Sequence, residues 1–134
     1  MSERDRSQLE RIHYEYIRAV DDGEPESLAN LFAPNGTFAL GDRSFEGREE
    51  IREFLESSAA NRPAAYQHLA TNPIITVEGD EATARWSYVL LKADDPDHGD
   101  GEWAMGTHDV EYGKHGGEWK MDRLTATRTY TGDV

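Results

Sequence analysis

The fold is decided by residues 81–92, EATARWSYVLLK. Every second residue from Ala82 to Leu90 is apolar or aromatic, and Trp86 and Tyr88 are the largest of them. The residues between them form a second alternating series. Alternation with a period of two is typical of a β-strand whose two faces differ. The sequence therefore predicts a long strand here and a sheet built around it.

Further strands are expected on both sides of this one. The sequence predicts them over 66–77, 102–112 and 118–130. Glycine-containing turns separate them, at 78–80 and 113–117. The acidic run at 94–101, DDPDHGDG, predicts a solvated loop, because it lacks the ligand order of a calcium-binding loop.

Helical periodicity marks the first twenty residues. Apolar residues recur at steps of three and four positions, which places them on one helix face; they are Leu9, Ile12, Tyr16 and Val20. The sequence therefore predicts a helix over 4–21, ended by a left-handed Gly23. His13 lies beside the apolar face, where we expect a packing histidine with its hydrogen bonds satisfied. Asp21 lies about 120° from the centre of that face.

Two shorter helices are expected before the long strands. One covers 25–32 and has a proline in its first turn, where no backbone hydrogen bond is lost. The other covers 48–58. Between them, 34–36 and 41–43 have turn composition, and 37–40 predicts a short strand.

The order of these elements indicates the fold class. Helices first and antiparallel strands after are typical of an α+β domain, and 134 residues suit a single domain over 1–134. A strongly twisted sheet must cover one face, and three helices can do so. A curved sheet under helices leaves a cavity of the kind that binds small ligands.

Composition excludes several classes of function. The formal net charge is −13, so the surface repels nucleic acids and anionic membranes. There is no cysteine, which excludes disulfides, thiolate metal sites and cysteine nucleophiles. No apolar run approaches the roughly 18 residues of a membrane span, and the charged N-terminus is unlike a secretory signal. We expect a cytoplasmic protein.

Four segments resemble the SnoaL-like group of the nuclear-transport-factor-two-like superfamily. They are YIRAVDDG with LANLFAP (16–23 and 28–34), FEGREEI (45–51), HLATNP (68–73) and GGEWKM (116–121). Their order and spacing cover nearly the whole chain. The resemblance implies a cone-shaped α+β barrel, with three N-terminal helices packed on a strongly curved, mixed and mostly antiparallel sheet. It also implies a homodimer formed through the outer face of the sheet.

Asp21 and His68 carry the functional implication of this resemblance. Scytalone dehydratase and related enzymes of the superfamily are similar at both positions, and polyketide cyclases use the same pair of groups. In those enzymes a histidine moves a proton and an acid orients it. An imidazole titrates near neutral pH, and a carboxylate on its far nitrogen fixes its tautomer. The chain departs from scytalone dehydratase at Val20, where that enzyme has a tyrosine, so its substrate is not carried over.

Strand register adds His108 to the candidate catalytic residues. If Val110 faces the core, period two makes His108 face it too, beside the small residues Ala104 and Gly106, which would leave room for a ligand. His108 is then a second acid–base group or a donor to the substrate. The side chains that we expect to bind the substrate are Tyr14, Tyr16, Trp86, Tyr88 and Met105.

Together these residues predict a cofactor-independent lyase or isomerase of the dehydratase or cyclase type. Its substrate would be a small hydrophobic molecule, aromatic or polycyclic in character. The sequence contains no HExxH pattern and no two histidines at helical spacing, so it predicts no metal site. No cofactor is expected. The alternative is a non-catalytic domain of the same fold that binds a small ligand or serves in assembly.

Overall fold

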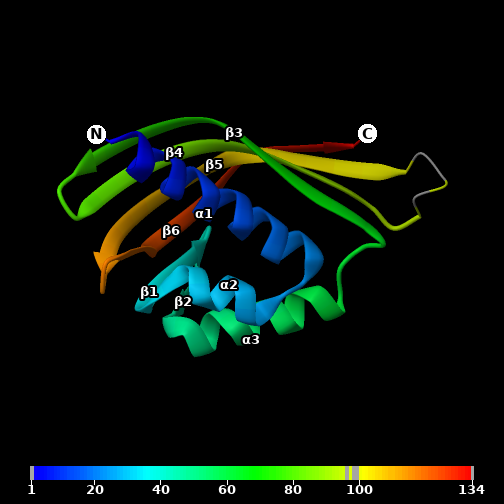
Figure 1. Cartoon of the computed structure of the whole chain (residues 1–134). Helices are drawn as coiled ribbons and strands as arrows, with labels where there is room; N and C mark the ends of the chain where they lie inside the picture. Colours follow the sequence, from blue (N-terminus) through cyan, green and yellow to red (C-terminus); the bar gives the residue numbers. More distant parts are fainter. Residues whose placement is uncertain (1, 96, 98–99, 134) are drawn as a thin grey trace.

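One layer of helices covers a curved sheet in the computed structural model, which describes residues 2–95, 97 and 100–133 (Figure 1). The acidic run at 94–101 therefore lies partly outside the described residues. The helices are α1 (Glu3–Asp22), α2 (Pro25–Leu31) and α3 (Gly47–Ala60). The strands are β1 (Phe32–Leu40), β2 (Arg43–Glu46), β3 (Ala65–Glu78), β4 (Glu81–Ala93), β5 (Gly101–His115) and β6 (Glu118–Asp133).

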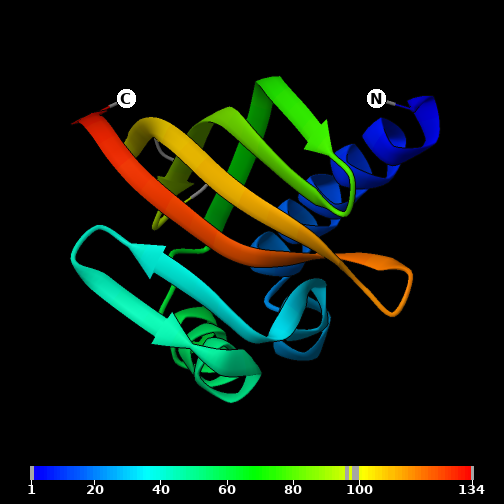
Figure 2. The same ribbon diagram turned by 90° about the vertical axis from the view of Figure 1, so that its left-hand side faces the viewer.

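In the described part of the chain, the strands form a single sheet in the order β2-β1-β6-β5-β4-β3. Neighbouring strands are antiparallel except for β1 and β6, which run parallel. The sheet curves around the helices without closing, because β2 and β3 remain edge strands (Figure 2). The predicted α+β class and the mixed, mostly antiparallel sheet are confirmed, and the cone is an open one.

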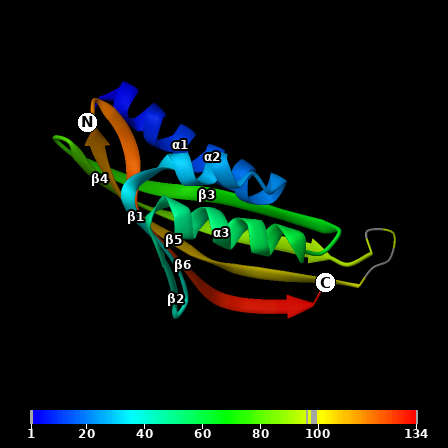
Figure 3. The ribbon, with the colours of Figure 1, turned by 90° about the horizontal axis from the view of Figure 1, so that it is seen from below.

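Helix α1 lies diagonally under the sheet, and its two ends have clear chemical causes (Figure 3). Ser2 accepts a hydrogen bond from the backbone N–H of Asp5 at 3.0 Å, which caps the first turn. Gly23 ends the helix with φ +68°, a conformation that glycine adopts without strain. The predicted apolar face is confirmed, because Leu9, Ile12, Tyr16 and Val20 are all buried. This helix delivers Asp21 to the edge of the sheet.

Between residues 32 and 46 the predicted strand at 37–40 is confirmed, but the turn predicted before it is wrong. The segment 34–36, expected to form a turn, lies inside β1. Phe32 pairs with Met121 and Thr37 with Arg123, so four residues of β1 lie opposite the single residue 122 of β6 and form a bulge. Strand β2 was not predicted, because four residues are too few to establish an alternating pattern.

Strand β3 contains a bulge that affects the orientation of its side chains. Thr71 pairs with Ser87 and Ile74 with Arg85, so one extra residue is accommodated around Asn72, whose φ is +55°. Before the bulge, even-numbered residues such as His68 face the helices. After it, odd-numbered residues such as Ile75 do so. Pro73 lacks an N–H, which an edge strand tolerates.

The core lies between the helices and the inner face of the sheet. From β4, β5 and β6 it receives alternate residues, as the period-two pattern predicted. The buried residues that these strands contribute include Ala82, Ala84, Trp86, Val110, Tyr112, Met121 and Leu124. The described residues contain no helix long and apolar enough to cross a membrane.

The outer face of the sheet keeps several large apolar side chains exposed. Leu69, Met105 and Tyr130 are about half exposed, at 52%, 42% and 55%. Register places them in one row, because Val89 pairs with both Leu69 and Met105, and Met105 pairs with Tyr130. We call this row and the adjacent Leu91 and Trp103 the outer apolar face. Contiguous apolar patches of this kind mark interaction surfaces.

Candidate active site

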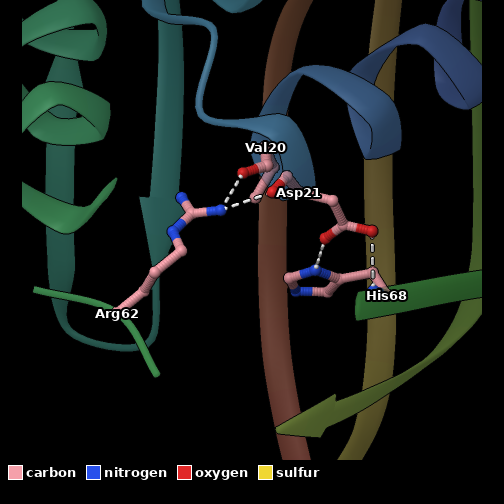
Figure 4. Close-up of polar contacts among 4 residues, drawn as sticks. All are labelled: Val20, Asp21, Arg62 and His68. Atoms are coloured by element: carbon pink, nitrogen blue, oxygen red, sulfur yellow. Dashed lines mark hydrogen bonds and ion pairs between the residues drawn. The ribbon is translucent and has the colours of Figure 1, made fainter. Parts of the chain in front are cut away.

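Asp21 and His68 meet where the end of α1 reaches strand β3. Oδ1 of Asp21 lies 2.6 Å from Nδ1 of His68, and Oδ2 accepts the backbone N–H of His68 at 2.8 Å (Figure 4). Both carboxylate oxygens of Asp21 therefore contact His68. The two contacts fix the position of the carboxylate and the rotation of the imidazole together.

This geometry also selects the tautomer of His68. An ionised carboxylate only accepts hydrogen bonds, so the proton between the two groups belongs to Nδ1. Nε2 then carries the lone pair, which is the arrangement of a histidine base oriented by a carboxylate. The side chains of His68 and Asp21 are 11% and 10% exposed. The pair is thus sheltered but still reaches the surface.

Arg62 secures the end of α1 that carries Asp21. It lies beyond α3, and its Nη1 donates to the backbone carbonyls of Val20 at 2.8 Å and Asp21 at 2.7 Å (Figure 4). The guanidinium also lies 4.5 Å from the ring centroid of Tyr66. A cation at a helix C-terminus is favourable, because the last carbonyls there have no partner within the helix. Sequence reasoning missed Arg62, since nothing in its surroundings in the chain distinguishes it from a surface arginine.

His108 lies on the inner face of β5, as its register predicted, and is 1% exposed. Its Nδ1 lies 3.1 Å from Nε2 of His13, which is fully buried on α1. Burial, together with the nearby imidazole of His68, lowers the pKa of His108 to about 3. Burial also lowers the pKa of His13 well below its ordinary value, with His108 contributing. Both imidazoles are therefore neutral near pH 7.

The aromatic residues around His108 tie it to the rest of the site. The Tyr88 ring stacks on His108 with centroids 4.5 Å apart and lies 6.1 Å from the ring of His68. Tyr16 contacts His108 edge-on at 5.4 Å. Burial raises the pKa of the Tyr16 hydroxyl. Tyr16 and Tyr88, predicted to bind the substrate, thus lie beside the candidate catalytic side chains.

Trp86 is buried on the inner face of β4 but packs away from the Asp–His pair. Its ring stacks on His13 at 4.2 Å. Trp86 is therefore a core residue at the helix–sheet interface, in contact with His13.

Two predicted substrate-binding residues lie elsewhere. Met105 is on the outer apolar face, because period two turns it away from its neighbours Ala104 and Gly106. Tyr14 is 49% exposed and lines a groove of about 600 Å³ between α1 and α2, whose other residues include Arg11, Arg18, Ser27 and Lys120. The Tyr14 ring lies edge-on to Trp86 at 5.7 Å, and its hydroxyl donates to Glu10 at 3.4 Å rather than to a residue of the Asp–His pair.

Gly106 does not provide the predicted room for a ligand. A Cβ atom at this position would collide with the backbone carbonyl of Thr127 and approach Cε2 of Tyr88 at 2.9 Å. The glycine instead allows β5 to lie close to β6 at a register shift and lets the Tyr88 ring lie over the strand. Among the described residues, no group of three or more histidine or acidic side chains is arranged to hold a metal ion.

Comparison with known proteins identifies the family. Residues 2–125 match the SnoaL-like domain, and the chain belongs to that family. No curated protein sequence matches it.

Solved structures share the fold at low sequence identity. Hexachlorocyclohexane dehydrochlorinase LinA-type3 from Novosphingobium barchaimii has a TM-score of 0.85 at 17% identity, covering 97% of this chain and 90% of that one. A proposed scytalone dehydratase from Novosphingobium aromaticivorans has a TM-score of 0.82 at 23% identity, covering 97% and 87%. Rv3472 from Mycobacterium tuberculosis, of unknown function, has a TM-score of 0.83 at 20% identity, covering 93% of this chain and 72% of that one. The fold is therefore shared by dehydratase-type enzymes and by proteins without an assigned activity.

Proposed function

We propose that this protein is a cofactor-independent acid–base enzyme, a lyase or isomerase of the dehydratase or cyclase type. The observation that carries the proposal is the 2.6 Å contact between Oδ1 of Asp21 and Nδ1 of His68. A surface ion pair does not need the second contact, in which the same carboxylate accepts the backbone N–H of His68. The double contact favours a histidine that is held in one orientation for chemistry.

In the proposed reaction, Nε2 of His68 removes a proton from a carbon next to a carbonyl or an aromatic ring. The electron pair of the broken C–H bond forms a new C–C double bond. In an elimination, a leaving group departs from the adjacent carbon with its own electron pair. In an isomerisation, His68 returns the proton to another carbon. Asp21 stabilises the imidazolium in between, and His108 faces the substrate oxygen that gains charge.

The proposed substrate is a small, mostly apolar molecule, aromatic or polycyclic in character. Tyr16, Tyr66 and Tyr88 surround the two catalytic imidazoles, and their rings offer apolar surface with polar hydroxyl groups. The protein's net charge of −13 disfavours polyanionic substrates. Aromatic walls with a few placed polar groups are typical of small-molecule sites.

Proton removal can be tested without knowing the leaving group. A panel of cyclic ketones, including 2-tetralone, is incubated with the protein in heavy water, and exchange of the α-protons is followed by NMR. We expect catalysed exchange that is lost in His68→Gln. The matched control is His115→Gln, because His115 also pairs with a carboxylate, Asp122, at 2.7 Å but is about half exposed. Equal exchange rates in the wild-type protein and His68→Gln would contradict the proposal.

We also propose a homodimer formed through the outer apolar face. The row of Leu69, Val89, Met105 and Tyr130 crosses four strands of this face without a charged residue in it. A second copy would bury them against the same residues, as a two-fold interface requires. This surface is also the observation that favours assembly as a second candidate function. Substitution on the outer apolar face separates the two roles, since it leaves the Asp–His pair unchanged.

A further inference from the structure

The contact between His13 and His108 contains one proton, which belongs to one of two nitrogens. Nε2 of His13 and Nδ1 of His108 are 3.1 Å apart, and both residues are buried. For two neutral imidazoles, either His13 donates to His108 or His108 donates to His13. The choice determines the tautomer of His108, that is, whether its proton is on Nδ1 or on Nε2.

The surroundings of His13 favour one choice. Its other nitrogen, Nδ1, is buried without a hydrogen-bond partner in the described part of the chain. If His108 donated, neutral His13 would carry a proton on Nδ1, and a buried N–H would have no acceptor. If His13 donates, Nδ1 is a bare lone pair. Orphaned buried N–H groups are rarer in proteins than under-satisfied acceptors, so His13 is the donor.

Stacking holds each ring in its own plane, and the planes of the two imidazoles are 55° apart. Trp86 lies nearly parallel to His13, with ring planes 8° apart. Tyr88 lies nearly parallel to His108, with ring planes 9° apart. Rotation of either imidazole out of its plane would break a stacked contact as well as the hydrogen bond. The pair is thus held in one arrangement from both sides.

We propose that His13 is a positioning residue. By donating from Nε2 to Nδ1 of His108, it holds His108 in the tautomer that has its proton on Nε2. His108 then offers a neutral N–H donor to the substrate oxygen, while His68 alone takes the proton from carbon. The catalytic part of this inference rests on the proposed function, whereas the tautomer does not depend on it.

The two histidines thereby receive different roles from their partners. A carboxylate accepts from His68 and leaves its Nε2 as a base, whereas an imidazole donates to His108 and leaves its Nε2 as a donor. A neutral imidazole can stabilise a developing oxyanion without giving up its proton. When His68 is protonated, its charge disfavours protonation of the nearby His108. The two groups therefore do not compete for the same proton.

The tautomers are measured directly in the resting protein. Long-range proton–nitrogen NMR correlations on protein labelled with nitrogen-15 in histidine distinguish a proton on Nδ1 from one on Nε2. We expect His108 to carry its proton on Nε2 and His68 on Nδ1. A proton on Nδ1 of His108, or a doubly protonated His108, overturns the inference. A wrong tautomer at His68 alone contradicts the proposed function but not this inference.

Substitution of His13 supplies the second measurement. His13→Gln keeps a side-chain amide N–H that can donate to His108, whereas His13→Leu removes the donor. We expect His13→Gln to retain the Nε2–H tautomer of His108, and His13→Leu to lose it. In the ketone exchange assay, His13→Leu should lower kcat by about 10² with little change in KM, and His13→Gln should recover part of it. Unchanged His108 tautomers in a folded His13→Leu protein overturn the inference; if that variant does not fold, the wild-type and His13→Gln spectra decide it.

Discussion

Oδ1 of Asp21 lies 2.6 Å from Nδ1 of His68, although the two residues are 47 positions apart in the chain. One comes from the last turn of α1 and the other from an edge strand of the sheet. A negative charge at a helix C-terminus is unfavourable by itself. The second bond, from the backbone of His68, and the guanidinium of Arg62 offset that cost.

The first prediction concerns Asp21→Asn. The amide keeps the size of the side chain, but only its oxygen can accept, so it cannot replace both contacts of Asp21 with His68. Either the backbone N–H of His68 loses its acceptor, or the NH2 group faces Nδ1 and the imidazole loses its contact or changes tautomer. We expect kcat for ketone exchange to fall by about 10² to 10⁴, with a circular dichroism spectrum like that of the wild type. Asp122→Asn, in the exposed Asp–His pair, should leave kcat unchanged.

The second prediction concerns Arg62→Leu. This variant removes both hydrogen bonds to the end of α1, and bonds from a charged donor are each worth about 1.5 to 3 kcal/mol. We expect a lower free energy of unfolding in urea and a lower kcat, because the end of α1 that holds Asp21 loosens. Arg62→Lys should recover part of both. The exposed Arg85, paired with Asp109, provides the control, since Arg85→Leu should change neither quantity appreciably.

The third prediction is a loss of stability below pH 6.5. The pKa of His108 is about 3 in the folded protein, below its ordinary value of 6.5, so the unfolded chain binds more protons between these pH values. Stability from this group is fully present above pH 6.5 and falls as the pH drops toward 3, by at most about 1.4 kcal/mol per pH unit. His13 adds to the loss in the same direction.

Urea unfolding at several pH values checks this. The double variant His13→Leu, His108→Phe removes both groups, and its free energy of unfolding should depend less on pH over this range. The same slope in the double variant and the wild type would assign the acid sensitivity to other groups.

The fourth prediction concerns Gly106→Ala. The added Cβ meets the carbonyl of Thr127 and the ring of Tyr88. Overpacking of this kind costs about 1 to 3 kcal/mol, so we expect a lower Tm. Displacement of Tyr88 should also change the ring-current shifts of His108 in NMR spectra. Thr107→Ala, on the same strand and the opposite face, should change these shifts much less.

The fifth prediction tests the proposed dimer. Met105→Lys places a charge in the middle of the outer apolar face, where Met105 is paired with Val89 and Tyr130. We expect a dimeric wild type and a monomeric variant in sedimentation analysis. Thr83→Lys, on the same face of β4 but outside the apolar row, should remain dimeric. A monomeric wild type would contradict the proposed homodimer.

Long periodic segments allowed most of the fold to be predicted. The period-two pattern of 81–92 and the three- and four-residue steps of α1 each span enough residues to define a face. The segment 32–46 lacks such a pattern. There the long bulge of β1 and its pairing with a strand some 90 residues later override the local preference of Pro34 and Gly36 for a turn.

The candidate site was predictable only where a residue type or a register carried information. Asp21 and His68 came from resemblance, and His108 from alternation along its strand. Arg62 and the bond between His13 and His108 depend on contacts across the fold, which no local pattern encodes. His13 was expected to have its hydrogen bonds satisfied, but its Nδ1 lacks a partner in the described structure. Met105 and Tyr14 have side chains suited to binding an apolar ligand, but Met105 lies on the outer apolar face and Tyr14 is about half exposed.

The bulge at Asn72 lets both ends of β3 present a side chain to the helices, although His68 and Ile75 are an odd number of positions apart. A strand without it would have to place His68 and Ile75 on opposite faces, so chemistry at one end would conflict with packing at the other. Deleting a single residue at the bulge would reverse which side chains of one half of the strand face the helices, so that either His68 or Ile75 would point away from them.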